Sequence, residues 1–224
     1  MNKQLDLNAP SGELSTKDKL ILEGIKLFSK HGFDGTTTRM LAEAIGANNA
    51  VVYFHFKSKE NLYAEVLHYV AEKARLYFQP LQDEILKSYE DKELTSEEAW
   101  ICIEKFIDLY INLLHDEDRK EELYLLLHEE LNPANGERPI TLVACRGAEN
   151  LLKHLLMTYW ECGNYQTACI ASRLVISSLV ALTEHPTFLK LSLQLKPEED
   201  LPASAWDDIR SYTLNSIKSY KNVL

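Results

Sequence analysis

Residues 36–62 read TTTRMLAEAIGANNAVVYFHFKSKENL, and this stretch decides how the rest of the chain is interpreted. An apolar-periodic segment stops at Gly46, and a second short segment begins two residues later. Two helices joined by a short turn that contains Gly have the geometry of a helix-turn-helix. The second helix of such a unit lies across the major groove of DNA, and its first residues reach base edges. The stretch therefore predicts a unit that reads DNA.

The first residues of the second helix are candidates for contact with bases. Asn48 and Asn49 can both donate and accept hydrogen bonds, which suits the adenine edge, and Val51 suits a thymine methyl group. Ala50 is small enough to let the backbone approach closely. Hydroxyl, imidazole and cationic side chains around this tip are usual partners of phosphate. They are Thr36, Thr37, Arg39, Tyr53, His55, Lys57 and Lys59.

Alternatives remain for the same residues. A helix turn that contains Gly is common in all-α proteins of any function. The two threonines can serve only as helix caps, and His55 alone is more often an ordinary surface or core histidine. Tyr53 is expected to point to the core together with Val52 and Phe56, although it is also a candidate for phosphate contact.

The flanking sequence predicts three short helices over residues 16–62 and the start of a long fourth one. Ser15 and Asp18 have the form of a capping box, and Gly32 closes the first helix. Ser58 caps the fourth helix, which Pro80 should kink or stop. Further apolar positions at three- and four-residue spacing predict helices near 96–115, 118–131, 139–161, 165–184 and 203–221. With only 8 Gly and 7 Pro, the chain is expected to be all-α.

Charge is distributed unevenly along the chain. The net charge of the 224 residues is −10, which by itself disfavours nucleic acid as a partner. Residues 1–62, however, hold 8 Lys and Arg against 7 Asp and Glu, whereas the remainder holds 16 against 27. An acidic protein can still bind DNA if only its less acidic tip faces the duplex.

The composition points to a protein of the cytoplasm. Its 46% hydrophobic and 26% charged residues are typical of a soluble globular protein, and we expect no membrane-spanning helix. The N-terminus lacks the pattern of a signal peptide. The four cysteines form no CxxC pair and have no matching histidine spacing, so we expect free thiols, no metal and no cofactor.

The segment from Thr16 to Leu62 resembles the DNA-binding domain of the TetR family of transcriptional regulators. The resemblance lies in KLFSKHGFDGTTTRMLAEAIGANNAVVYFHFKSKENLY, about a quarter of the chain. Its most specific part, YFHFKSKE at residues 53–60, fits the family pattern Y-x-H-F-x-S-K-E without a gap. The resemblance implies that DNA is contacted by Thr36, Thr37, Arg39, Asn48, Asn49, Tyr53, His55 and Lys59.

Three positions depart from the family pattern. Ala50 stands where Gly is usual, Val51 where a small polar residue is frequent, and Met40 where an acidic residue is common. The methyl group of Ala50 shifts how the backbone docks, and Val51 makes the operator preference hard to guess.

The remaining residues are expected to form a dimer surface and an effector pocket. Dimers that place two reading helices one groove turn apart gain affinity and select palindromes. The interface candidates, which could also belong to the monomer core, are Ala171, Leu174, Val175, Ser178, Leu179, Leu182, Ile209, Tyr212 and Ile217. The resemblance further implies an apolar pocket, for which the candidates are Phe106, Tyr110, Leu114, Tyr124, His128, Tyr159 and Trp160.

We therefore expect an arm over 1–15, a helix-turn-helix domain over 16–62, and a larger effector-binding and dimerisation domain over 63–224. The favoured function is a regulator, not an enzyme, most often a repressor. It would bind a palindromic double-stranded operator as a homodimer and be released by a small-molecule effector. One alternative is a constitutive regulator without an effector. Another is a helical hydrolase that uses His128, Glu129 and Cys145, although the sequence shows no nucleophile–base signature for it.

Overall fold

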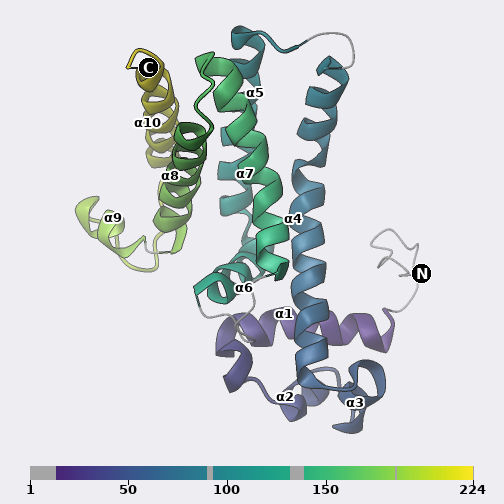
Figure 1. Cartoon of the computed structure of the whole chain (residues 1–224). Coiled ribbons are helices and arrows are strands. Elements are labelled where there is room, and N and C mark those ends of the chain that lie inside the picture. Colours follow the sequence, from purple (N-terminus) through teal and green to yellow (C-terminus); the bar gives the residue numbers. More distant parts are fainter. Residues whose placement is uncertain (1–13, 90–92, 132–138, 185, 224) are drawn as a thin grey trace. The chain divides into compact units, whose positions relative to one another are not determined.

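The computed structural model describes residues 14–89, 93–131, 139–184 and 186–223, and every regular element in those ranges is a helix (Figure 1). The expected all-α class is thus confirmed. The elements are α1 (Thr16–Gly35), α2 (Thr38–Ala44), α3 (Ala50–Phe56), α4 (Lys59–Tyr89), α5 (Ser96–His115), η1 (Glu117–Arg119), α6 (Lys120–Leu131), α7 (Pro139–Trp160), α8 (Tyr165–Glu184), α9 (Thr187–Ser192) and α10 (Ala203–Lys221).

The long helices lie close to their predicted ranges, with two differences. Of the two outcomes predicted at Pro80, a kink or a stop, the stop does not occur, because α4 continues through Pro80 to Tyr89. The short helix α9 was not predicted, because six residues give too little apolar periodicity to be recognised. The predicted arm over 1–15 falls largely outside the described residues.

The chain forms two compact units, which we describe separately. The head unit comprises residues 1–73 and 121–143, and the body unit comprises residues 74–120 and 144–224. The head unit therefore holds α1, α2, α3, the first half of α4, and α6. The expected division after residue 62 differs from this one, because the second segment of the head unit follows almost fifty residues later in the chain.

The core of the head unit forms where α1 lies against the start of α4. Gly24 faces Val66 so closely that a Cβ atom at residue 24 would lie 2.8 Å from Val66 Cγ2. Next to this contact, the ring of Phe28 meets the ring of Tyr63 edge-on at 4.7 Å. Buried aliphatic side chains from all four helices complete the core: Leu20, Ile21, Ile25, Leu41, Val52, Leu62 and Val66.

Polar contacts in the interior hold α6 within the head unit. The Tyr63 hydroxyl donates to Glu129 Oε2 at 2.7 Å, and both residues are buried. Burial raises the pKa of Tyr63 well above its usual value, and the hydrogen bond to Glu129 adds to the shift. Further along α4, Lys73 pairs with the buried Glu122. A carboxylate removed from water needs such partners, so these contacts fix how α6 lies on α4.

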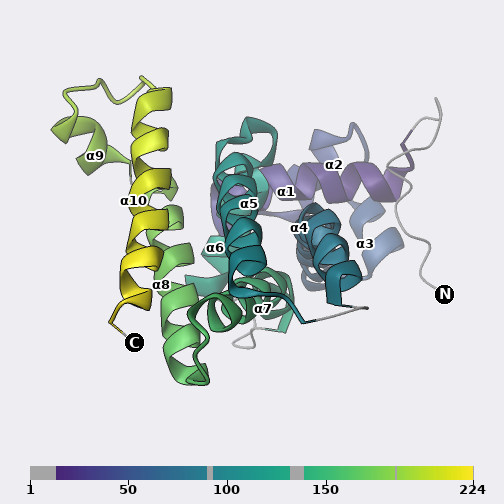
Figure 2. The same ribbon diagram turned by 90° about the horizontal axis from the view of Figure 1, so that it is seen from above.

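The body unit packs α5 against α7, α8 and α10 (Figure 2). Thr95 begins α5 with a complete capping box to Glu98. Arg210 of α10 pairs with Asp108 of α5, its Nη2 donating to Oδ2 at 3.0 Å. The interior is apolar, with fully buried Ile103, Phe106, Ile107, Leu152, Leu155 and Leu156. Three of the expected thiols, Cys102, Cys162 and Cys169, are free.

Candidate nucleic-acid interface

The turn between α2 and α3 is built around Gly46. Its φ of +68° lies in the left-handed region, which glycine adopts without strain. The Gly46 amide donates to Glu43 O at 3.0 Å, and the Ala47 amide donates to Ala42 O at 2.9 Å. These two bonds are the Schellman pattern of a helix C-terminus. The turn is therefore closed by its own backbone, which fixes the direction in which α3 leaves it.

The start of α3 is exposed, as a reading helix requires. Asn48, Asn49 and Ala50 are exposed, and Val51 is half-buried. The Asn48 side-chain oxygen accepts from the Ala50 amide at 3.0 Å, so Asn48 caps the start of the helix. The Asn49 side chain makes no capping hydrogen bond. Both asparagines thus offer polar groups to solvent at the tip.

The two faces of α3 have separate roles. Val52 and Phe56 are buried and anchor the helix to the head core. Tyr53 is 54% exposed and Phe54 is 75% exposed. The expectation that Tyr53 points to the core was therefore wrong, and its alternative role as a surface contact remains open. Phe54 was missed. Because residues 52 and 56 share the inner face, residues 53 and 54 between them must point outward.

The exposed edge of α2 holds two further candidates. Thr37 caps α2, its hydroxyl accepting from the Met40 amide at 3.2 Å, and it remains exposed. The Arg39 side chain is 79% exposed and pairs with Glu43 Oε1 at 2.7 Å. An exposed pair of this kind contributes little to stability. Arg39 can therefore exchange Glu43 for phosphate at small cost.

Two residues that were predicted to contact DNA instead form hydrogen bonds inside the head unit. Thr36 is fully buried, and its hydroxyl is placed to donate to Gly32 O at 2.8 Å or Leu27 O at 3.1 Å. The Lys59 ammonium donates to Phe33 O at 2.8 Å and Thr36 O at 3.0 Å. We correct both assignments. Thr36 and Lys59 hold the bend between α1 and α2, and thereby position Thr37 and Arg39.

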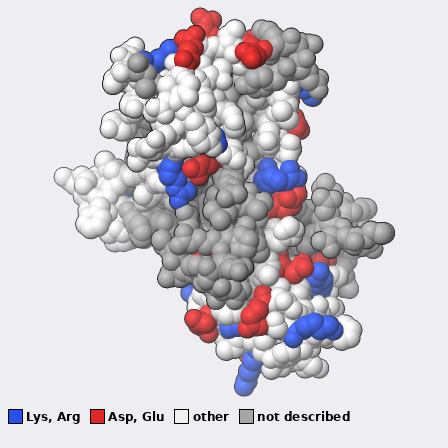
Figure 3. Space-filling model, in the orientation of Figure 1, with Lys and Arg blue, Asp and Glu red and all other residues white. Residues whose placement is uncertain are grey.

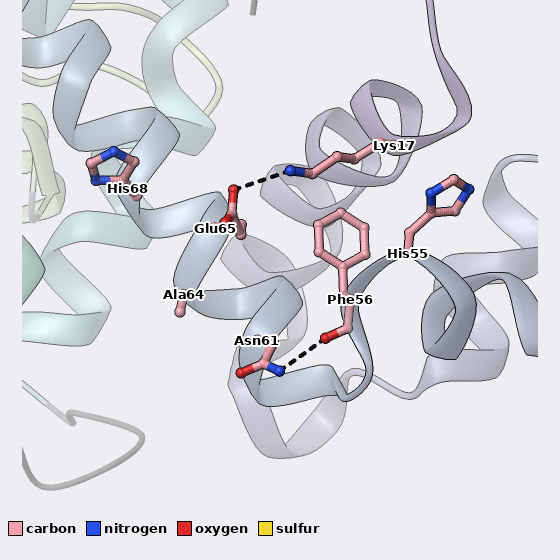
Figure 4. Close-up of a pocket in the computed structure, with 7 residues that line it drawn as sticks. All are labelled: Lys17, His55, Phe56, Asn61, Ala64, Glu65 and His68. Atoms are coloured by element: carbon pink, nitrogen blue, oxygen red, sulfur yellow. Dashed lines mark hydrogen bonds and ion pairs between the residues drawn. The ribbon is translucent and has the colours of Figure 1, made fainter. Parts of the chain in front are cut away.

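A shallow groove of about 380 Å³ lies behind α3, between the start of α1 and α4 (Figure 4). Lys17 pairs with Glu65 across it at 3.5 Å, and the Asn61 amide donates to Phe56 O at 2.9 Å. The latter bond satisfies a carbonyl in the last turn of α3. The half-buried His55 lies at the rim. The groove therefore marks the junction that fixes α3 on α4.

Charge on the visible face of the head is mixed. In Figure 3, Lys and Arg side chains at the end that carries α2 and α3 lie among Asp and Glu side chains. The sequence shows the same near balance over residues 1–62. Attraction to phosphate therefore has to come from a few placed groups rather than from a broad basic surface.

The predicted effector residues belong to different units, and those of the body unit lie on two helices, α5 and α7. In the body unit, the buried Phe106 stacks on Tyr110 at 5.8 Å, and Leu114 is also buried. Tyr159 and Trp160 lie instead at the end of α7, where the Trp160 indole donates to Ile217 O at 3.1 Å. Tyr124 belongs to the head unit.

The hydrolase alternative depends on His128, Glu129 and Cys145, and of these the structure describes the side chain of Glu129 alone. The side chains of His128 and Cys145 lie outside the described residues. Glu129 is the buried acceptor of the Tyr63 hydroxyl. The one described member therefore has a structural role in the head unit.

The predicted dimer residues separate into exposed and buried positions. Leu174 is 65% exposed, Tyr212 is 77% exposed, and Ser178 is also exposed. Leu179 and Ile217 are buried in the body unit, so their assignment to an interface was wrong. Both fall on the inner faces of their helices, which the apolar pattern alone does not separate from the outer faces. The half-buried candidates are Ala171, Val175, Leu182 and Ile209.

The helix α8 is apolar on its exposed side as well. Residues 165–182 have a mean hydropathy of 1.4, and only 22% of them are buried. By length and composition alone this helix is apolar enough to cross a membrane, a test that core helices of soluble proteins also pass. The exposed Ile170 and Leu174 lie on the side of α8 that the body unit does not cover.

A Gly-closed turn, an anchored α3 with an exposed polar start, and an all-helical body define a helix-turn-helix regulator. Residues 20–66 match the family model of bacterial regulatory proteins, tetR family. Over these residues the chain is similar to the TetR family of transcriptional regulators.

Known relatives agree with this assignment. The chain is similar to the uncharacterized HTH-type transcriptional regulator YerO of Bacillus subtilis (strain 168), with 29% identity over 121 residues. These residues are 54% of this chain and 38% of YerO. It is 42% identical over 52 residues to the HTH-type transcriptional repressor AcnR of Corynebacterium diphtheriae, which is 23% of this chain and 27% of AcnR. The matches thus span well under half the length of these relatives.

The similarity of fold extends over most of the chain. The ketosteroid transcriptional regulator KstR2 of Mycobacterium tuberculosis superposes with a TM-score of 0.63 at 14% identity, covering 90% of this chain and 94% of KstR2. At this identity the likeness concerns the fold alone.

Proposed function

We propose that this protein is a repressor that binds a palindromic operator as a dimer and is released by a small-molecule effector. The observation that carries the proposal is the exposed start of α3 behind the Gly46 turn, with Asn48 and Asn49 facing solvent. The protein would act in the cytoplasm by binding, without catalysis.

In this proposal α3 enters the major groove. Asn48 and Asn49 contact base edges, Ala50 permits close approach, and Val51 meets a thymine methyl group. The exposed Phe54 adds an apolar contact beside Tyr53. Phosphates are held by Thr37, Arg39, Tyr53 and His55, while Thr36 and Lys59 keep this edge in place.

The docking is tested by measuring operator affinity against salt concentration. The operator is first selected from random DNA, and a palindromic site is the expected product. The slope of log affinity against log salt is negative, and each lost phosphate contact makes it less steep by about 0.9. Arg39→Ala should therefore make it less steep by about 1.8 in a dimer. Lys87→Ala removes the same charge from an exposed position in the body unit and should leave the slope unchanged. An unchanged slope in Arg39→Ala would refute the docking.

Base readout gives a second, independent measure. Asn49→Ala should cost about 1–3 kcal/mol of discrimination at one base pair of each half-site, with little effect on nonspecific binding. Equal weakening on all sequences would reassign Asn49 to the phosphates.

The effector is proposed to act on the body unit. Supporting this is an aromatic cluster in which Phe78 lies 5.4 Å from Phe106 and 5.9 Å from the half-buried Tyr110. Such a cluster suits an apolar ligand with one hydrogen-bonding group. The effector must favour the arrangement of the dimer that does not bind DNA. The helix α4 is continuous from Lys59 to Tyr89, so it can transmit a displacement from the body to the head.

Calorimetry with a panel of apolar metabolites, followed by operator release, tests this step. A binding ligand should release DNA from the wild type and bind Tyr110→Ala more weakly. A ligand that binds without changing operator affinity, or a panel with no binder, would favour the constitutive alternative.

A further inference from the structure

Lys57 ends α3 in a backbone conformation that residues with a side chain avoid. Its φ is +71° and its ψ is −31°, outside the regions that residues with a Cβ atom ordinarily occupy. Elsewhere in the part of the head unit that the structure describes, positive φ is found at Gly32 and Gly46. Glycine adopts such angles without strain. A lysine at position 57 therefore costs stability that glycine would not, which points to a use for its side chain.

Hydrogen bonds on both sides of Lys57 impose this conformation. The Lys57 amide donates to Tyr53 O at 3.1 Å. The Asn61 side-chain amide donates to Phe56 O at 2.9 Å, and the Asn61 backbone amide donates to Ser58 Oγ at 3.2 Å. These bonds fix the end of α3 and the start of α4. The strain thus belongs to the junction between the two helices, whichever residue stands at position 57.

The Lys57 side chain is not used inside the protein. It is exposed and forms no hydrogen bond or ion pair with any residue that the structure describes. Arg39, by contrast, pairs with Glu43, and Lys59 donates to two backbone carbonyls of the head unit. A lysine at the end of a helix also interacts with the helix dipole. This interaction is weak for an exposed side chain on α3, which has seven residues.

The position of Lys57 places its charge at the proposed DNA edge. Lys57 follows Tyr53 by one helical turn, and Tyr53 is a proposed phosphate contact that is 54% exposed. Position 57 is one of the two variable positions in Y-x-H-F-x-S-K-E, so the resemblance gives it no role. The resemblance assigns a phosphate contact to Lys59, two residues further on, whose ammonium is engaged inside the head unit. An ammonium on a flexible stem binds phosphate as a point charge.

We propose that Lys57 makes the contact with an operator phosphate that the resemblance assigns to Lys59. The inference rests on the proposed function and adds a residue to its DNA interface. The folded protein is less stable with lysine at position 57 than with glycine, and it binds the operator more tightly.

The first test is the salt dependence of affinity for the operator selected from random DNA. Lys57→Gln removes the charge and should make the slope of log affinity against log salt less steep by about 1.8 in a dimer. If the two lines meet at about 1 M salt, binding at about 0.1 M salt is about 60-fold weaker. Lys57→Arg keeps the charge and should bind as the wild type does. The matched control Lys87→Gln removes an exposed charge from the body unit and should leave the slope unchanged.

The second test is thermal unfolding without DNA. Lys57→Gly relieves the strain and should raise Tm by about 2–4 °C, while its slope changes as that of Lys57→Gln does. A lower Tm in Lys57→Gly would overturn the argument from strain. A role for Lys57 in the helix dipole alone would instead lower the Tm of Lys57→Gln and leave its slope unchanged, which would overturn the phosphate contact.

The outcomes separate this inference from the proposed function. An unchanged slope in Lys57→Gln, with a less steep slope in Arg39→Ala, would overturn the inference and leave the docking of α3 standing. A less steep slope in Lys59→Met, with none in Lys57→Gln, would return the contact to Lys59. A wild type that selects no site from random DNA would overturn the inference and the proposed function together.

Discussion

Replacing Gly24 by alanine should destabilise the head unit, although alanine favours helices. A Cβ atom at residue 24 would lie 2.8 Å from Val66 Cγ2. Val66 is fully buried and β-branched, so it has no free rotamer on a helix. Overpacking of this kind costs about 1–3 kcal/mol, against a gain of about 1 kcal/mol from helix propensity. We expect a net loss of about 1 kcal/mol, which lowers Tm by about 2–4 °C.

The same substitution at Gly147 provides the control. Gly147 lies exposed in α7, and a Cβ atom there would meet nothing within 4 Å. Gly147→Ala should therefore raise the free energy of unfolding by up to about 1 kcal/mol. Both variants can be compared by urea unfolding followed by circular dichroism. If Gly24→Ala also raised the free energy of unfolding, the close approach of α1 to α4 would be refuted.

Three further substitutions probe the contacts that position the reading edge. Tyr63→Phe removes a donor from the buried Glu129 and should cost about 1.5–3 kcal/mol in urea unfolding. Because the folded pKa of Tyr63 exceeds the unfolded value of about 10, its stabilisation is complete below that pH and is lost above it. Between about pH 10 and 11 the free energy of unfolding of Tyr63→Phe should therefore fall less than that of the wild type. An equal fall in both proteins would contradict the assignment. Lys59→Met should cost about 1–2 kcal/mol of stability, and the affinity of the folded dimer for the operator should not fall, because Lys59 makes no phosphate contact in the proposed docking. Gly46→Ala should cost about 1–2 kcal/mol, since alanine at φ +68° is strained, and thermal melts would detect it.

Much of the fold could be predicted because the helices are long and their ends are marked by local chemistry. The hydroxyls of Ser15, Thr37 and Ser58 cap α1, α2 and α4, as their positions in the sequence indicate. Gly32 and Gly46 both take positive φ where the sequence places a break. Such signals act over a few residues, so one sequence suffices to read them.

The parts that could not be predicted depend on tertiary contacts. Nothing near Thr36 shows that its hydroxyl will face Gly32 O, or that Lys59 will reach Phe33 O from 26 residues away. For the same reason Leu179 and Ile217 could not be separated from Leu174 and Tyr212. An apolar stripe shows that a helix has something to bury, but not whether its own chain or another covers it.

The discontinuous head unit also limits how this protein can be taken apart. The chain leaves the head along α4, returns to it in α6 and leaves again in α7. A chimera that grafts residues 1–73 onto a foreign body would therefore leave behind α6 and the carboxylates that meet Tyr63 and Lys73. Recombination that swaps DNA specificity between relatives therefore has to transfer α6 together with the reading helices, or redesign the contacts between α6 and α4.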